Sequence, residues 1–188
     1  MHTTTRTRPA LAAALTLALV ALAGCGKVSE IASEKAAEKM IESQINQDGG
    51  NTKVDLSKGG VTAEGTDKDG KAFKMEMGSA QVAEQDIGLP FYPGAKPVEN
   101  TGTRIRNGEM QMVSLELQAN APAKDVAGWY RQQMKGRGEG AMLIDNARDD
   151  GGLQLSIIDE KSKQNLNIEV SADGDGSRIT LMHSSGGQ

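Results

Sequence analysis

The chain has 188 residues, with 21 lysines and arginines against 25 aspartates and glutamates, so its formal net charge is −4. An acidic chain repels nucleic acid, so no nucleic-acid partner is expected. The single cysteine, Cys25, excludes a disulfide framework and a multi-cysteine zinc site.

The amino-terminal residues have the composition of an export signal. Residues 1–8 carry two arginines and no acid, and the fourteen residues Ala10–Ala23 are uncharged. A membrane-spanning helix needs about 20 residues, so we expect residues 1–24 to be a signal peptide. Its removal would take away Arg6 and Arg8, leaving 19 basic against 25 acidic residues and a mature net charge of −6.

The segment Leu22-Ala23-Gly24-Cys25 resembles the lipobox of bacterial lipoproteins. The resemblance implies cleavage between Gly24 and Cys25 and a lipid on the Cys25 sulfur. The membrane would then be a partner through that lipid. One acyl chain binds a protein to the membrane only reversibly, whereas the two or three chains of a lipoprotein anchor it firmly. Gly26, in place of aspartate, resembles lipoproteins released to the outer membrane of two-membrane bacteria, facing the periplasm. The alternative is an ordinary secretory signal followed by a free cysteine.

Residues 25–50 are expected to hold the lipidated cysteine and a tether helix. The composition of Val28–Gln47 predicts a helix that ends at Gly49-Gly50. Its apolar face is only partial, and glutamates recur every fourth residue as a like-charged stripe that mildly destabilises a helix. These are Glu30, Glu34, Glu38 and Glu42. We favour a solvated tether loosely docked on the domain, with a coiled-coil partner helix as the alternative.

Residues 51–188 are expected to form a domain in which the apolar residues recur with the period of two that strands show. Asp69-Gly70 and Asn107-Gly108 are expected at hairpin turns, which favour these pairs. The predicted strands are Val54–Leu56, Val61–Glu64, Ala72–Met77, Pro97–Ile105, Met110–Gln118, Ala141–Asp145, Leu153–Ile158, Asn165–Ser171 and Arg178–His183. Pro122–Lys135 is predicted to be a helix with one apolar face. The expected fold is α+β, a mostly antiparallel sheet with one packed helix.

Residues 88–96, with the sequence GLPFYPGAK, resemble the P-x-YPGA segment of a group of small bacterial envelope lipoproteins. In that group a strand follows this segment, and a helix then begins within a stretch similar to T-x-D-S-P-x-x-V-x-x-F-Y. Residues 118–130 are the counterpart of that stretch in this chain. The resemblance covers roughly Val54–Leu181 and implies the fold and the location. The group brings no agreed activity. Ala121 stands where the group has a serine cap, so either Asn120 caps the helix or the helix start is weaker by about 1 kcal/mol.

Two of the few aromatic residues, Phe91 and Tyr92, lie in this segment. The favoured interpretation is that they pack under Trp129 and Tyr130, because few other aromatics exist to fill the interior. The alternative is an exposed recognition patch.

The mature chain offers little for catalysis, and we expect no enzyme, no catalytic residue and no bound cofactor. His183 is the only histidine beyond the signal peptide, and lipid on Cys25 excludes a cysteine–histidine nucleophile. Asp145, Asp149 and Asp150 sit in a run typical of turns. A hydrolase that uses carboxylates stays as a distant alternative.

Two methionine pairs, Met75 with Met77 and Met110 with Met112, each place two thioethers on one face of a strand, because alternate residues share a face. Soft sulfur ligands suit Cu(I), and Met182-His183 could add to them. We favour methionines that fill an aromatic-poor core, and therefore no metal site. A periplasmic Cu(I)-binding protein is the alternative.

These features predict a lipid-anchored envelope protein with a non-catalytic binding or structural role. An envelope protein could be its partner.

Overall fold

The computed structural model describes residues 27–47, 49–56, 59–137 and 140–186. The expected signal peptide and Cys25 lie outside these residues. The chain divides into two compact units, Met1–Ser33 and Glu34–Gln188. Helix α1 (Lys27–Asn46) begins in the first unit and ends in the second, and the description below concerns the second. Within the described part of the chain, no helix has both the length and the apolar character needed to cross a membrane.

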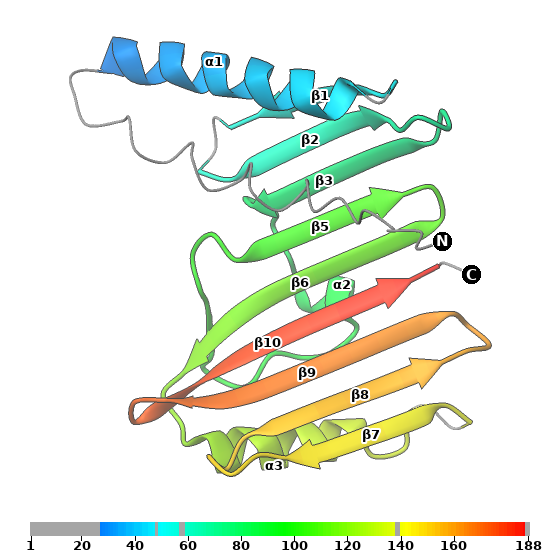
Figure 1. The fold of residues 1–188 in the computed structure, drawn as a ribbon. Helices are drawn as coiled ribbons and strands as arrows, with labels where there is room; N and C mark the ends of the chain where they lie inside the picture. The colour runs from blue at the N-terminus through cyan, green and yellow to red at the C-terminus, as the bar shows by residue number, and fades with distance from the viewer. Residues whose placement is uncertain (1–26, 48, 57–58, 138–139, 187–188) are drawn as a thin grey trace, which may run out of the picture. The chain divides into compact units, whose positions relative to one another are not determined.

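The second unit is built on a ten-stranded sheet (Figure 1). The strands are β1 (Asn51–Asp55), β2 (Val61–Thr66), β3 (Ala72–Gly78), β4 (Lys96–Pro97), β5 (Gly102–Asn107), β6 (Met110–Ala119), β7 (Met142–Ala147), β8 (Leu153–Asp159), β9 (Gln164–Asp173) and β10 (Gly176–Ser185). Their order is β1-β2-β3-β5-β6-β10-β9-β8-β7, with β4 paired to β6 off this path. All these strand pairs are antiparallel, so the mostly antiparallel α+β fold is confirmed.

The predicted hairpin turns are confirmed. Asn107 pairs with Met110 across the β5–β6 turn, and Gly108 in that turn has a φ of 57°, which favours glycine. In the β2–β3 turn the Asp67 carboxylate accepts hydrogen bonds from the backbone N–H groups of Asp69 and Lys71, both at 2.9 Å. Asp67 thus stabilises the turn through its side chain.

The prediction of one strand over Pro97–Ile105 is wrong. The structure has β4 and β5 there, separated by residues 98–101. Pro97 has no N–H to donate to a ladder, and Asn100 has a φ of 59°, which breaks the extended backbone.

Helices α2 (Glu84–Ile87) and α3 (Ala123–Met134) contact one face of the sheet, which we call the helix-side face. Helix α3 contacts β8, β9 and β10, and α2 contacts β6 and β10. Alternate residues of the central strands point to this face and form the core with the apolar side of α3. The fully buried residues include Leu117, Leu155, Ile168, Val170, Ile179, Leu181, Val126 and Tyr130. The structure therefore adds α2 to the one packed helix that was predicted.

Helix α3 begins without a side-chain cap. Its N-cap residue is Pro122, which makes no side-chain capping bond, so of the two expected alternatives the structure has the uncapped start and not a cap by Asn120. The Pro122 carbonyl instead accepts the N–H of Asp125 at 2.9 Å.

The end of α1 lies along the outer edge of β1. Three α1 side chains, spaced four residues apart on one helix face, accept hydrogen bonds from alternate backbone N–H groups of this edge. The bonds join Thr52 N to Asn46 Oδ1 (2.7 Å), Val54 N to Glu42 Oε1 (2.8 Å) and Leu56 N to Glu38 Oε1 (3.0 Å). Glu38 and Glu42, two glutamates of the like-charged stripe, therefore accept hydrogen bonds that the carbonyl groups of a neighbouring strand would otherwise accept.

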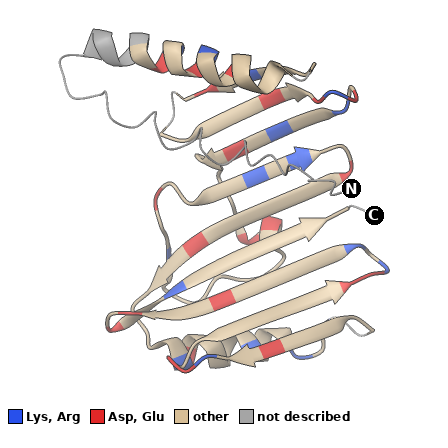
Figure 2. Cartoon of the chain, in the orientation of Figure 1, with Lys and Arg blue, Asp and Glu red and all other residues tan. Residues whose placement is uncertain are grey.

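Charged residues are distributed over the fold with both signs interspersed. Figure 2 shows basic and acidic positions scattered over α1, the strands and the turns. Charge alone therefore does not indicate where a partner would bind.

Candidate functional site

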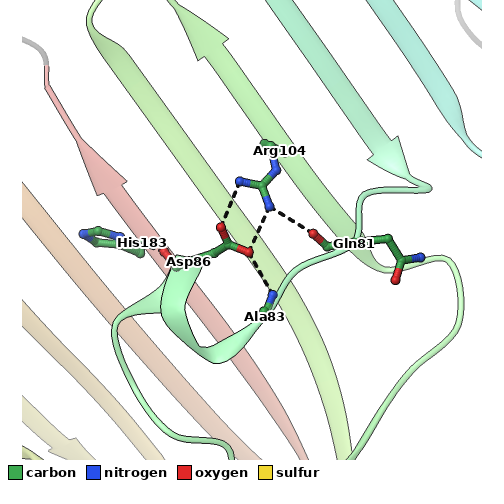
Figure 3. Close-up of polar contacts among 5 residues, drawn as sticks. All are labelled: Gln81, Ala83, Asp86, Arg104 and His183. Carbon is green, nitrogen blue, oxygen red and sulfur yellow. Dashed lines mark hydrogen bonds and ion pairs between the residues drawn. The ribbon is translucent and has the colours of Figure 1, made fainter.

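A cluster of polar contacts lies between α2 and the helix-side face of the sheet (Figure 3). Arg104 of β5 donates to both carboxylate oxygens of Asp86, from Nη1 to Oδ1 at 3.1 Å and from Nη2 to Oδ2 at 2.9 Å. Arg104 Nη2 also donates to the Gln81 carbonyl at 2.9 Å. The backbone N–H of Ala83 donates to Asp86 Oδ2 at 2.9 Å. His183 of β10 places Nδ1 3.1 Å from the Asp86 carbonyl oxygen.

Strand register brings these residues together. Val113 of β6 pairs with Arg104 on one side and with His183 on the other. Directly paired residues point to the same face, so Arg104 and His183 both project from the helix-side face, about 10 Å apart at the backbone. Asp86 contacts both of them, with its carboxylate on one side and its carbonyl on the other.

Arg104 determines the ionisation state of Asp86 in this cluster. The Arg104 guanidinium, helped by the Ala83 N–H, holds the pKa of the Asp86 carboxyl below its ordinary value, and Asp86 in turn raises the pKa of Arg104. Both side chains are largely buried, with 18% of Arg104 and 24% of Asp86 exposed. The pair is therefore ionised and holds α2 on the sheet.

The His183 ring is oriented by the backbone of α2. A carbonyl oxygen only accepts hydrogen bonds, so Nδ1 carries the hydrogen in this contact. In the neutral ring Nε2 is then the acceptor nitrogen.

Next to this cluster is a pocket of about 310 Å³ at the carboxyl ends of α2 and α3. Apolar and polar side chains both line it, as is usual for small-ligand sites. Its lining residues are Ile87, Gly88, Met134, Arg137, Ile157, Asp159, Gln164, Leu166 and His183. Two of the lining residues are joined directly, since Arg137 donates from Nη1 to the Gly88 carbonyl at 2.6 Å.

The pocket lining combines apolar side chains with a few hydrogen-bonding groups. The hydrogen-bonding groups come from Arg137, Gln164 and His183. The Asp159 carboxylate already accepts hydrogen bonds within the β8–β9 turn. It accepts from Ser162 Oγ at 2.7 Å and from the Lys161 N–H at 2.9 Å, and these bonds lower its pKa.

The residues expected in a turn-like acidic run have separate roles. Asp145 lies in β7, where the predicted strand Ala141–Asp145 places it, and not in the turn that follows. Its carboxylate pairs with Arg131 of α3 at 2.9 Å, which lowers the pKa of Asp145. Asp150 accepts the Gly152 N–H at 3.0 Å and so stabilises the β7–β8 turn.

The methionine pairs lie on one face of one sheet. Met75 of β3 and Met112 of β6 both pair with Ile105 of β5, which lies between them. Met182 of β10 shares that face, because it pairs with Ser114 of β6. We call Met75, Met77, Met110, Met112 and Met182 the methionine face; it is opposite to the helix-side face.

His183 cannot join the methionine face. Neighbouring residues of a strand point to opposite faces, and His183 contacts α2 on the helix-side face. Met182-His183 therefore does not act as one unit toward a metal ion. Within the described residues, no three His, Cys, Asp or Glu side chains gather as metal ligands would.

The predicted aromatic packing is confirmed. Tyr92 meets Trp129 edge to face with ring centroids 5.5 Å apart, and Trp129 meets Tyr130 in the same way at 4.8 Å. Phe91 is half-buried and packs against the same core. Burial raises the pKa of the Tyr130 hydroxyl, so Tyr130 stays neutral.

Gly24 and Cys25, the predicted cleavage and lipidation residues, lie outside the described residues. Asp86 and Arg104 were not found by sequence reasoning, since 18 residues separate them and neither belongs to a recognisable motif. Comparisons of the chain with protein-family models, with curated proteins and with solved structures find no match.

Proposed function

We propose that this chain is a lipid-anchored bacterial envelope protein that acts by binding a partner or a small ligand and not by catalysis. The observation that carries the proposal is Leu22-Ala23-Gly24-Cys25, directly after the uncharged stretch that ends at Ala23. Lipid on Cys25 would hold the domain at the membrane. In a cell with two membranes, Gly26 favours the outer membrane, with the domain in the periplasm. The chain would then be a signal peptide (1–24), an anchored tether helix (25–50) and the sheet domain (51–188).

The pocket beside His183 supports a binding role. It combines apolar walls with Arg137 and Gln164, and the ionised Asp86–Arg104 pair holds the adjoining α2 in place. The negative charge of Asp86 is balanced by the positive charge of Arg104. His183 forms its hydrogen bond with a backbone carbonyl and not with a carboxylate. This geometry favours recognition over proton transfer.

The binding role is tested by crosslinking the full-length protein in living cells and identifying what co-purifies, relative to an unrelated lipoprotein. We expect a reproducible envelope partner or a retained small molecule. Arg137→Glu should reduce its recovery if the pocket is the site. Lys96→Glu, at an exposed position of β4 away from the pocket lining, is the matched control and should leave recovery unchanged. Equal recovery with both variants would exclude the pocket, and no enrichment over the unrelated lipoprotein would contradict partner binding.

Cu(I) binding is a second candidate because five thioethers share the methionine face. The test is competition between the purified protein and a Cu(I) chelator. A Cu(I)-binding protein would lose copper when Met75, Met77, Met110 and Met112 are all changed to leucine. Unchanged competition in that variant would exclude this candidate.

A further inference from the structure

The two outer strands of the sheet, β1 and β7, differ in what lies along their outer edges. At β1, the α1 side chains of Asn46, Glu42 and Glu38 accept the outward N–H groups. At the other end, β7 pairs with β8 and is the last strand of the order. All six β7 residues are exposed, although Arg131 of α3 reaches Asp145 of β7. One edge is therefore covered within the chain, and the other presents a strand (Figure 1).

The β7 edge is unusually apolar for an exposed strand. Met142 and Leu143 are each 57% exposed and Ile144 is 38% exposed. Natural sheets usually protect such an edge with charges, proline or a covering element, because it pairs readily with another strand. Asp145 is the one charged residue of β7, and its carboxylate already forms an ion pair with Arg131.

From this contrast we infer that β7 pairs antiparallel with β7 of a second copy of this chain, which extends the sheet across a two-fold axis. Unpaired backbone groups of an edge strand specify another extended strand as the occupant. The sequence of β7 favours a second copy, because it is self-complementary in one register.

That register is centred on Leu143. Leu143 then lies opposite Leu143 of the second copy, and Met142 lies opposite Ile144 in both directions. Directly opposed residues of an antiparallel pair share a face, so every exposed apolar side chain meets an apolar one. A register centred on Ile144 would place Leu143 against Asp145, and one centred on Asp145 would oppose two carboxylates. Both alternatives are disfavoured.

The covered β1 edge determines where the assembly stops. A two-fold contact uses the same patch on both copies, and among the described residues each copy has one uncovered outer strand, β7. The pairing therefore closes at two copies and does not extend into a fibre.

The test uses the full lipoprotein in cells with one added cysteine, since lipid occupies Cys25. In Leu143→Cys, the two introduced thiols lie opposite each other across the two-fold axis, at the Cα separation that a disulfide or a short bismaleimide spans. We expect most of this variant to form a covalent species of twice the monomer mass on treatment with oxidant or reagent. Met110→Cys, an exposed residue of the β5–β6 hairpin, is the matched control and should stay monomeric.

A second variant separates pairing from chance collision at the membrane. Adding Ile144→Lys to Leu143→Cys places a charge opposite Met142 of the second copy, and the covalent dimer should be lost. The inference is overturned if Leu143→Cys stays monomeric, if it crosslinks no more than Met110→Cys, if Ile144→Lys leaves the dimer intact, or if the product has the mass of this chain joined to a different protein. The last result would mean that another protein supplies the strand. None of these outcomes depends on the pocket, so this test and the partner search fail independently.

Discussion

Arg104 and Asp86 form a two-point ion pair that ties helix α2 to strand β5, with Nη1–Oδ1 and Nη2–Oδ2 distances of 3.1 and 2.9 Å. The connector that resembles the P-x-YPGA segment follows α2 directly. The pair therefore positions this connector and one wall of the pocket beside His183.

Replacing Arg104 by alanine should lower the free energy of unfolding by about 1–2 kcal/mol, because Asp86 would keep a largely buried charge without its partner. Urea unfolding of the purified protein measures this. Arg106→Ala is the control, because Arg106 lies on the same strand and face but is exposed; its effect should stay within about 0.5 kcal/mol. Equal losses in the two variants would show that the ion pair adds no stability of its own.

The same pair should make stability depend on pH in the acid range. The pKa of Asp86 is lowered in the folded state, so its stabilisation is fully present above the ordinary aspartate pKa of about 3.9 and is lost as pH falls through the lower folded value. Asp86→Asn removes this group. The stability difference between wild type and Asp86→Asn should therefore shrink as urea titrations move from neutral pH to about pH 3. A difference that stays constant over this range would contradict the pairing.

Asn46 is expected to protect the β1 edge. Its side chain accepts the Thr52 N–H at 2.7 Å and donates to the Thr52 carbonyl at 3.1 Å. Asn46→Ala should cost about 1 kcal/mol and speed amide exchange in β1. Hydrogen exchange followed by mass spectrometry reports this, with exposed Gln44→Ala on the same helix as control. Unchanged exchange in β1 would mean that α1 does not cover this edge in solution.

Tyr92 is expected to shield Trp129, the single tryptophan of the chain. Tyr92→Ala should lower stability by about 2 kcal/mol and shift tryptophan emission to longer wavelength, because the edge-to-face contact is lost and water reaches the indole. Tyr92→Phe keeps the ring and should leave the emission unchanged. If Tyr92→Ala also leaves it unchanged, the two rings do not pack in solution.

Local features of the fold were predictable from sequence. Asn107-Gly108 indicated the β5–β6 hairpin because the turn chemistry is contained in adjacent residues. The apolar positions around Val126 indicated α3 and its buried side, since the helical period is also local.

Long-range features were not predictable in the same way. Pairing of β6 with β10 joins Leu117 to Ile179, and no local pattern encodes such a register. The contact of His183 with Asp86 depends on that pairing, because the pairing sets which residues of β6 and β10 lie side by side. In the isolated helix, Glu38 and Glu42 belong to a like-charged stripe that Lys35 and Lys39 partly offset, and nothing in the helix alone indicates a contact with a strand. Beside β1 the two glutamates accept backbone hydrogen bonds.

The central claim, attachment through Cys25, is tested most directly by the mass of the amino-terminal peptide of the protein purified from its membrane fraction. We predict a peptide that begins at Cys25 and carries the added mass of diacylglycerol and, where the amine is acylated, a further acyl chain. Cys25→Ser should abolish both the lipid and the membrane association. An unlipidated Cys25, or a Cys25→Ser protein that stays in the membrane fraction, would contradict the account.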